Sequence, residues 1–484
     1  MNPDLNSQLI LLLPEMIIAF FAMFVLVLDL YFKDKEKNLV YGLSQLALLF
    51  AAISTAIQGF EIKVLAFNGM FISDSISTYL KLLAYISMSL VFTYSRTYLK
   101  ARLLLKGEYF SLSLFVLLGV MLMISSMNLL MIYMGLELLS LSLYALVALD
   151  RDNPKASEAA MKYFVLGALA SGLLLYGMSM LYGLTGSLDL LIIANALQET
   201  PIDQSILVFG LVFIVVGIAF KFGAAPFQMW VPDVYQGAPL PITMLIGSVP
   251  KFAAVAMSIR LLFQGLETLS SEWQQMFLFM ALLSMLIGNI TAIAQTNIKR
   301  MLAYSTISHV GFIFLGLMSG SVNGASAILF YIACYALMTL AAFGLIIALS
   351  ANGKDFELLD DFKGLNKRNP WAAAIFLITM LSLAGIPPTV GFYAKFSILE
   401  SIVSAGYIWP AVFAVMMALI GMYYYLRIIK LMYFDEAPKL IVINIPKSLL
   451  WVLTINTGSI ILLGIFPKTL MSIAAITAGF GLQS

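Results

Sequence analysis

Charged side chains occur within stretches of this sequence that are otherwise apolar. The acidic one is Glu137, and the basic ones are Lys81, Lys162, Lys221, Lys251, Lys395 and Arg427. A charge at the centre of a membrane helix costs about 2.5–3.5 kcal/mol on insertion scales, so each charge requires a compensating role. Carboxylates and amines can bind and release protons, and their presence within spans indicates a pathway for protons or ions.

Some of these residues have simpler explanations. A lysine near a helix end can extend its ammonium group to the membrane surface. Lys221 and Lys251 lie well inside their apolar stretches, which disfavours that explanation for them. Lys162 fits an anchor as well as a proton-transfer role. Lys81 and Arg427 fit better as anchors or as contacts with a neighbouring subunit.

The composition predicts an all-α, polytopic membrane protein. Only 11% of the 484 residues are charged and 62% are hydrophobic, whereas soluble domains average about 25% charged residues. The chain has one cysteine, Cys334, and one histidine, His309. This excludes an internal disulfide and disfavours zinc, haem and iron–sulfur sites. We therefore expect no cofactor and no metal in this chain.

Apolar runs of about 20 residues are long enough to span a membrane. The sequence contains fourteen candidates, at 9–30, 39–58, 71–93, 109–126, 128–149, 158–183, 205–235, 241–264, 274–296, 299–319, 324–350, 371–403, 408–432 and 449–471.

Prolines interrupt the seventh and twelfth of these spans. Pro226 follows Lys221 by five residues, and Pro387 and Pro388 precede Lys395. A proline lacks the N–H group that an intact helix needs, so both spans must break. Broken backbone at membrane depth is tolerated only where it is buried in protein or lines a wet cavity.

The two breaks are five spans apart, which suggests a repeated unit. We expect a first five-helix unit at 108–265 and a second at 266–434. An N-terminal three-helix segment (1–107) and a C-terminal helix (435–484) flank them. Because five is odd, the second unit is inverted in the membrane. Inverted repeats with broken helices are typical of ion-coupled transporters.

Basic residues favour the links that follow odd-numbered spans. They are Lys33, Lys35, Lys37, Arg96, Lys100, Arg102, Lys106, Arg151, Lys155, Lys299, Arg300, Lys354, Lys363, Lys367, Arg368, Lys430, Lys439 and Lys447. Links after even-numbered spans contain only Lys63, with Arg260 close to one of them. Cytoplasmic links are enriched in Lys and Arg, so this bias predicts that both termini are periplasmic.

Several motifs carry a family resemblance. They are Lys221-Phe-Gly-Ala-Ala-Pro226, Pro232-Asp-Val-Tyr-Gln-Gly-Ala-Pro239, Gly135-Leu-Glu137, Val249-Pro-Lys251, Lys299-Arg-Met-Leu-Ala-Tyr-Ser-Thr-Ile-Ser-His309 and Ala384-Gly-Ile-Pro-Pro388 with Gly391-Phe and Lys395. In order and spacing, the chain resembles the antiporter-like membrane subunits of respiratory complex I, most closely the subunit N group of bacterial NADH–quinone oxidoreductase. One departure is Gln228, where many relatives have histidine, so a protonatable role at this position is in doubt.

The resemblance implies a pair between Glu137 and Lys221 and a proton pathway that continues to Lys251 and ends at Lys395. Between them the proton would pass His309 or Lys299, and Lys162 is a further possible relay. His309 could instead serve helix packing, and Lys299 could be an anchor at a helix end. Burial favours a neutral lysine and a nearby carboxylate favours a charged one. Movement of Glu137 relative to Lys221 would therefore load or release a proton.

The resemblance also implies partners. Quinone reduction, with FMN and iron–sulfur clusters, would reside in other subunits of the complex. The expected neighbours are other membrane subunits, including an antiporter-like subunit and small membrane subunits, within the lipid bilayer of the bacterial inner membrane. No nucleic acid is expected.

Three alternatives remain open from the sequence. The chain could be a subunit of a multisubunit Na⁺/H⁺ antiporter or of a membrane-bound hydrogenase, which share the embedded lysines. It could also be a structural arm subunit without its own proton path, whose charges hold neighbouring subunits in register. Independently of these alternatives, Glu137 could simply neutralise Lys221 as a static ion pair.

Overall fold

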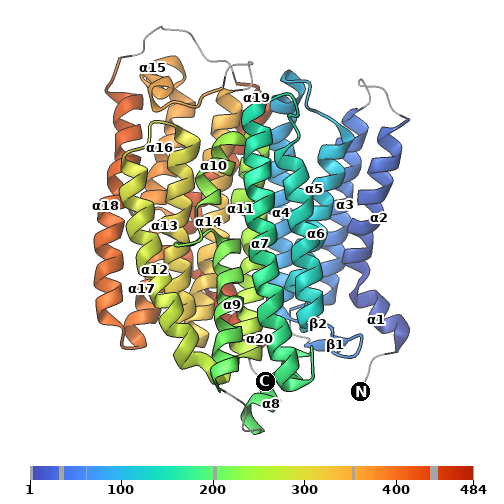
Figure 1. The fold of residues 1–484 in the computed structure, drawn as a ribbon. Helices are drawn as coiled ribbons and strands as arrows, with labels where there is room; N and C mark the ends of the chain where they lie inside the picture. Colours follow the sequence, from blue (N-terminus) through green and yellow to red (C-terminus); the bar gives the residue numbers. More distant parts are fainter. Residues whose placement is uncertain are drawn as a thin grey trace.

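Apolar helices of membrane-spanning length make up most of the chain (Figure 1). The computed structural model describes residues 4–31, 37–60, 63–199, 204–350, 355–436 and 445–482. Within these residues, 12 helices are long and apolar enough to cross a membrane. The count is 13 if the first two helices, which are bent by 62°, form one span. The predicted polytopic all-α fold is therefore confirmed.

The N-terminal half contains ten helices and a short hairpin. They are α1 (Leu5–Leu11), α2 (Leu13–Asp29), α3 (Lys37–Gln58), β1 (Val64–Ala66), β2 (Phe71–Ser73), α4 (Ser75–Ala101), α5 (Gly107–Ile124), α6 (Leu129–Val147), α7 (Pro154–Thr185), α8 (Leu190–Glu199), α9 (Gln204–Phe222) and α10 (Trp230–Gly237).

The remaining elements begin with α11 (Leu240–Ser258), which continues as a π-helical turn, η2 (Ile259–Gly265). They are followed by η3 (Glu267–Leu269), α12 (Ser270–Ile293), α13 (Ile298–Met318), α14 (Val322–Leu349), η4 (Leu359–Phe362), α15 (Leu365–Arg368), α16 (Pro370–Ala384), α17 (Val390–Ser404), α18 (Ile408–Tyr433), α19 (Lys447–Ile465) and α20 (Pro467–Leu482).

Side-chain caps fix where several helices begin. Asn128, Asn153, Asn297 and Asn369 each accept a hydrogen bond from a backbone N–H in the first turn of α6, α7, α13 and α16. Such caps satisfy N–H groups that have no partner within the helix. They set the axial positions of the helices that carry the candidate site.

The two predicted breaks occur at the expected prolines. The chain leaves α9 at Gly223 and re-enters a helix at Trp230, so the first break contains Pro226. It leaves α16 at Gly385 and re-enters at Val390, so the second contains Pro387 and Pro388. Gly223 and Gly385 have positive φ angles of 74° and 84°. Other residues rarely adopt this conformation, which lets the chain turn sharply out of each helix.

Three helices form the interior of the bundle. Within an apolar stretch of 18 residues taken from each helix, the buried share of residues is 100% for α11 with its π-helical turn and 94% for both α13 and α14. The same measure is 33% for α3, α18 and α19. Lys251 on α11 and Lys299 and His309 on α13 are therefore shielded by protein, whereas the outer helices present apolar side chains outward.

Backbone contacts in the two halves of the chain recur at a fixed spacing. Leu129 N–H donates to Leu188 O at 2.9 Å, and 169 residues later Ile298 N–H donates to Glu357 O at 2.7 Å. The adjacent bonds, Leu190 N–H to Met127 O and Leu359 N–H to Thr296 O, have the same spacing. In each half, the bonds tie the start of one helix (α6 or α13) to a later link.

Some predicted boundaries differ from the structure. The third span was predicted from residue 71, but α4 begins at Ser75 because Asp74 caps it and residues 71–73 pair with 64–66 in the hairpin. The predicted span 449–471 is divided, since α19 ends at Ile465 and Pro467 starts α20. The C-terminal segment therefore holds two helices rather than one.

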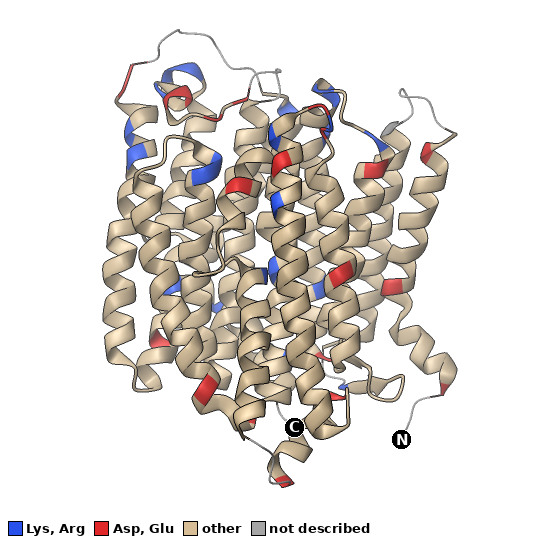
Figure 2. Ribbon diagram, in the orientation of Figure 1, with Lys and Arg blue, Asp and Glu red and all other residues tan. Residues whose placement is uncertain are grey.

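Both chain ends lie at the same end of the bundle (Figure 1). Most Lys and Arg residues lie at the opposite end, and a few occur at mid-depth (Figure 2). Of the basic residues used above to predict orientation, Lys33, Lys35, Lys354 and Lys439 lie outside the described residues, as does the side chain of Lys37.

A buried ion pair joins the N-terminal segment to the first five-helix region. Arg260, in the π-helical turn, donates to both carboxylate oxygens of Asp74, each at 2.7 Å. The two side chains are 0% and 1% exposed. Asp74 also accepts a hydrogen bond from Ser77 N–H and so caps α4. Removing one partner would leave an uncompensated charge in the protein interior.

We therefore expect Arg260→Met to destabilise the protein by about 3–5 kcal/mol, the usual cost of breaking a buried pair from one side. The matched control is Arg427→Met, because Arg427 is partly buried and, among the described residues, donates to the carbonyls of Ile293 and Gln295 without an ion pair. Thermal melting of the purified protein in detergent would compare them. Equal melting temperatures for the two variants would contradict the structural role of the Asp74–Arg260 pair.

Candidate functional site

Lys221 lies in the last turn of α9, immediately before the first break. Its ammonium group donates a hydrogen bond of 2.8 Å to the hydroxyl of Ser140 on α6. Glu137 lies three residues before Ser140 on the same helix and is close enough to act electrostatically on Lys221. These residues, both described, do not form an ion pair in this structure. Ser140 takes the place that the resemblance assigned to Glu137, and it was not among the predicted site residues.

A small cavity lies beside Lys221, between α6, α7, α9 and the first residue of α10. Its volume is about 20 Å³, and its polar lining groups are Ser140, Tyr144, Ser171 and Lys221. A water needs about 10–15 Å³ of such space and two to four polar partners, so the cavity can hold one. The predicted broken helix therefore borders a site suited to a water molecule.

Lys251 is buried on α11, directly after Pro250. Its ammonium group donates to the backbone carbonyl of Phe222, the last residue of α9. The final carbonyls of a helix have no partner within that helix. They also lie at the negative end of the helix dipole, which favours a cation. The first break thus supplies the hydrogen-bond acceptor that a buried lysine requires.

Lys395 has the corresponding contact at the second break. From the second turn of α17 it donates to Leu383 O at 3.0 Å and to Ala384 O at 2.8 Å, at the end of α16. Its side chain passes over Gly385, where an added Cβ would lie 2.9 Å from Lys395 Cδ. A cavity of about 230 Å³ adjoins it, lined mainly by apolar residues of α16, α17 and α18.

Helix α13 lies between the two lysine sites. The ring of Phe314 on α13 packs against Phe222 at 5.2 Å, beside the Lys251 site. The ring of Phe312 on the same helix lies 5.5 Å from the ammonium group of Lys395. The structure therefore brings Lys251, α13 and Lys395 into one lateral row.

His309 is buried on the same helix, α13, three residues before Phe312. Its Nδ1 lies 2.6 Å from the hydroxyl of Tyr331 on α14, and its Nε2 lies 3.2 Å from that of Tyr425 on α18. Tyr425 also shares a hydrogen bond with Ser305. The tyrosines were not predicted, because buried aromatic residues at helical spacing usually indicate packing alone.

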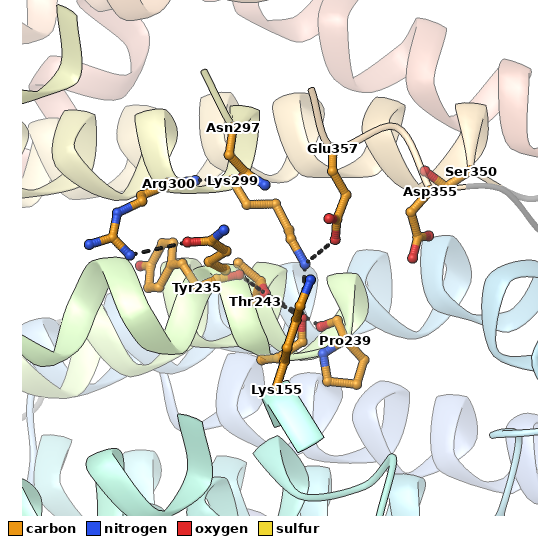
Figure 3. A network of polar contacts seen from close by, with 12 residues as sticks. Lys155, Tyr235, Pro239, Thr243, Asn297, Lys299, Arg300, Ser350, Asp355 and Glu357 are labelled. Atoms are coloured by element: carbon orange, nitrogen blue, oxygen red, sulfur yellow. Dashed lines mark hydrogen bonds and ion pairs between the residues drawn. The ribbon is translucent and has the colours of Figure 1, made fainter. Parts of the chain in front are cut away.

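Lys299 and Lys162 lie towards the end of the bundle that carries the basic links. Lys299 is buried in the first turn of α13, with an ion pair to Glu357 at 3.0 Å and a hydrogen bond to Ala238 O at 3.3 Å (Figure 3). Lys162 on α7 is 44% exposed and pairs with Glu158 at 2.9 Å and Asp233 at 2.8 Å. Both lysines have carboxylate partners, which fits an anchoring role.

Comparison with known proteins places the chain in a family. The family described as "NADH:quinone oxidoreductase/Mrp antiporter, TM" matches residues 126–421. The chain belongs to this family. The match includes both breaks and the residues Glu137, Lys221, Lys251, His309 and Lys395. It confirms the resemblance that the motifs indicated.

Individual members of the NADH:quinone oxidoreductase/Mrp antiporter family match nearly the whole chain. NADH-quinone oxidoreductase subunit N of Methylovorus glucosotrophus (strain SIP3-4) is 55% identical over 472 residues, covering 97% of this chain and 98% of that protein. A chain of respiratory complex I from Thermus thermophilus with bound aureothin is 30% identical, with a TM-score of 0.80, over 96% of this chain and 99% of that chain. A chain of the Mrp complex from Dietzia sp. DQ12-45-1b shares the fold at 20% identity, with a TM-score of 0.85, over 96% of each.

Lys81 differs from the expectation of a surface anchor or intersubunit contact. It is 2% exposed and pairs with Glu15 at 2.6 Å, which is 3% exposed. The pair joins α4 to α2 inside the bundle. The sequence signal was Glu15 itself, an acidic residue within the first apolar span that we did not include among the embedded charges.

The contrast between Lys162 and Lys299 can be tested by chemical modification. A water-soluble amine-reactive reagent should label Lys162 on the protein in detergent, because its side chain is 44% exposed. Lys299 should stay largely unlabelled, because its side chain is 5% exposed and paired with Glu357. Peptide mass spectrometry would quantify both in one sample. Equal labelling at the two lysines would contradict the buried Lys299 site.

Proposed function

We propose that this chain is the subunit N of a bacterial NADH–quinone oxidoreductase and that it transfers protons through Glu137, Lys221, Lys251, His309 and Lys395. The observation that carries the proposal is the choice of partners at three lysines. Lys221, Lys251 and Lys395 donate to a hydroxyl or to backbone carbonyls, and in the described part of the chain none of them has an ion pair.

Three other embedded cations have carboxylate partners, whereas Arg427 donates to the carbonyls of Ile293 and Gln295 but, as an arginine, does not deprotonate in proteins. Lys81 pairs with Glu15, Arg260 with Asp74 and Lys299 with Glu357. A close carboxylate stabilises the charged form of a lysine and opposes proton release. Hydroxyls and carbonyls support an ammonium group without a full opposite charge. Lys221, Lys251 and Lys395 are therefore better suited to gain and lose a proton than the paired cations, which hold helices together.

Glu137 would act as the variable partner of Lys221. Two unit charges about 4 Å apart interact by about 4 kcal/mol at an effective dielectric constant near 20. Because Ser140 holds Lys221 in this structure, a movement of the ammonium group from Ser140 towards Glu137 would change its proton affinity substantially. A water in the adjacent cavity could carry the proton. The separation of Glu137 and Lys221 weighs against the alternative of a permanent ion pair.

The finer architecture is part of the proposal. We infer fourteen spans by counting α1 with α2, α9 with α10, and α16 with α17 as single broken spans. Helices α16 and α17 have 15 residues each, and a single span needs about 20. The recurrence of backbone bonds at a spacing of 169 residues supports two five-helix units at 108–265 and 266–434. An odd number of spans per unit makes the second inverted.

We further propose a multi-pass location in the bacterial inner membrane with both termini periplasmic. The common position of the chain ends and the basic residues at the opposite end support this orientation (Figures 1 and 2). Basic residues are retained on the cytoplasmic side during insertion.

Electron transfer is assigned to partner subunits. The whole sequence contains one cysteine and one histidine, too few for iron–sulfur ligation within this chain. FMN, iron–sulfur clusters and quinone reduction would therefore reside elsewhere in the complex. We expect small membrane subunits and a second antiporter-like subunit as neighbours, with the latter near the cavity beside Lys395, and no nucleic acid.

The alternatives share the fold. A subunit of a Na⁺/H⁺ antiporter, or of a membrane-bound hydrogenase, would also contain embedded lysines, and a structural arm subunit would retain them as fixtures. The 55% sequence identity to a subunit N favours our assignment to subunit N over an assignment to an Mrp antiporter, of which the matching chain is 20% identical. The proteins that co-purify in mild detergent would separate these assignments, and recovery with Na⁺/H⁺ antiporter subunits would contradict ours.

Lys395 provides a test that separates charge from proton transfer. Lys395→Arg keeps a positive charge and donors for Leu383 O and Ala384 O, but arginine does not deprotonate in proteins. We expect the variant to assemble, with NADH-driven proton uptake into membrane vesicles strongly reduced. Lys430→Arg is the control, because Lys430 is 71% exposed at the end of α18. Full pumping by Lys395→Arg would identify Lys395 as an electrostatic fixture.

Ser140 provides a second test at the other end of the row. Ser140→Ala removes the hydroxyl that binds Lys221, and hydrogen bonds to charged groups contribute about 1.5–3 kcal/mol. Proton uptake and NADH oxidation should fall about tenfold or more, since 1.4 kcal/mol corresponds to a factor of ten. The control is Ser142→Ala on the same helix, whose hydroxyl bonds only Leu138 O at 2.8 Å. Equal activity of the two serine variants would remove Ser140 from the pathway.

A further inference from the structure

Both ring nitrogens of His309 face a tyrosine hydroxyl. Tyr331 lies 2.6 Å from Nδ1 and Tyr425 lies 3.2 Å from Nε2, and all three side chains are buried. A neutral imidazole has one N–H donor and one acceptor nitrogen, whereas a phenol hydroxyl can donate or accept. One tyrosine therefore donates to the ring and the other accepts from it. The opposite arrangement satisfies the same groups equally well.

The series of hydrogen-bonded hydroxyls extends beyond the ring to Ser305. Tyr425 shares a hydrogen bond with Ser305, which lies four residues before His309 on α13. Ser305 is nearer than His309 to the first turn of α13, where Lys299 pairs with Glu357. The chain Tyr331–His309–Tyr425–Ser305 thus crosses the lateral row of lysines rather than following it.

At the Tyr331 end of this hydrogen-bonded series, neighbouring residues of α14 line a cavity with polar groups in its wall. Ala327, one turn before Tyr331 on α14, and Phe330 both line a cavity of about 490 Å³. Six uncharged polar side chains from α14, α17 and α20 contribute to its wall: Asn323, Ser326, Ser397, Ser401, Ser404 and Ser472. A cavity of this size and polarity can hold water. Tyr331 does not itself line this cavity, but Phe330 and Ala327, its neighbours on α14, do.

We propose that Tyr331 and Tyr425 are proton-carrying partners of His309, so that the second five-helix region conducts protons along Tyr331–His309–Tyr425. This deepens the proposed function and rests on it. In one passage, Tyr331 gives its O–H proton to Nδ1, and the N–H proton at Nε2 passes to the Tyr425 oxygen. The ring is then the Nδ1–H tautomer, and a reorientation of the ring and hydroxyls that restores the Nε2–H form precedes the next passage. Tyr331 regains a proton from its water side and Tyr425 releases one towards Ser305. No net charge remains on the ring, which avoids the cost of a buried imidazolium.

Two neighbouring tyrosines provide matched controls. Tyr335 lies one turn after Tyr331 on α14 with its ring 5.3 Å from that of His309, but its hydroxyl donates to Thr306 at 2.9 Å. Tyr424 precedes Tyr425 on α18, and its hydroxyl donates to Asn289 at 3.1 Å. Because Tyr424 also interacts with Tyr425 and Ser305, Tyr335 is the cleaner of the two controls. Changing any of the four tyrosines to phenylalanine removes one buried hydroxyl and keeps the ring. Only Tyr331 and Tyr425 would interrupt the proton chain.

The test uses the assembled NADH–quinone oxidoreductase in vesicles, with NADH-driven proton uptake measured in H₂O and D₂O. Tyr331→Phe and Tyr425→Phe should each reduce uptake on the order of 100-fold, the lower end of what positioned proton-transfer groups contribute. Their solvent isotope effects should rise, because proton transfer then limits the rate. The double variant should lose no more than either single variant, since the groups act in series. Tyr335→Phe and Tyr424→Phe should retain uptake and the wild-type isotope effect.

Lys221→Ala, measured beside them, separates this inference from the proposed function. Loss of uptake in Lys221→Ala together with normal uptake in Tyr331→Phe and Tyr425→Phe would overturn the tyrosine chain alone. Normal uptake in Lys221→Ala would overturn the proposed function itself. Equal losses in all four tyrosine variants, with unchanged isotope effects, would assign these hydroxyls to packing and also contradict the inference.

Discussion

An ammonium group bound to the free carbonyls of a broken helix is the interaction on which the rest of this site depends. A proline break leaves the last carbonyls of α9 and α16 without helical partners inside the membrane-spanning region. Lys251 satisfies Phe222 O, and Lys395 satisfies Leu383 O and Ala384 O. Each group compensates the other, since an unpaired carbonyl and an isolated ammonium are both costly in an apolar interior. The balance leaves the lysine without a carboxylate, which suits it to the proton transfer proposed above.

The fold separates this kind of lysine contact from ordinary ion pairs. Asp74 with Arg260 and Glu15 with Lys81 tie α4 to neighbouring helices at full burial. Such pairs fix positions but hold their protons firmly. The interior helices α11 and α13 then carry Lys251 and His309 where protein surrounds them on all sides. Rigid ion pairs and neutral lysine partners would be complementary in the proposed proton route, because such a route requires stable geometry and adjustable charge together.

Sequence patterns could predict the spans, both breaks and the embedded lysines, because apolar run length and proline have direct physical consequences. They could not predict contacts between helices. Ser140 and Ser142 look equivalent in the sequence, and only the rotation of α6 shows which one meets Lys221. The same applies to Tyr331 and Tyr335, one turn apart on α14, of which only Tyr331 bonds His309. Glu15 was visible in the sequence as an acidic residue within an apolar span, but its pairing with Lys81 could not be predicted because the two are distant in the sequence.

The two lysine sites also explain why the repeat looks imperfect in its charges. Lys221 precedes its break and Lys395 follows its own, so the lysines do not align. The structural equivalents are instead Lys251 and Lys395, because each binds the terminal carbonyls of the half-helix before a break. The first site takes its lysine from α11 and the second from α17. The acceptor at the break determines where the ammonium group lies, and either α11 or α17 can supply that group. The break, rather than the lysine position, is therefore the element that the two halves share.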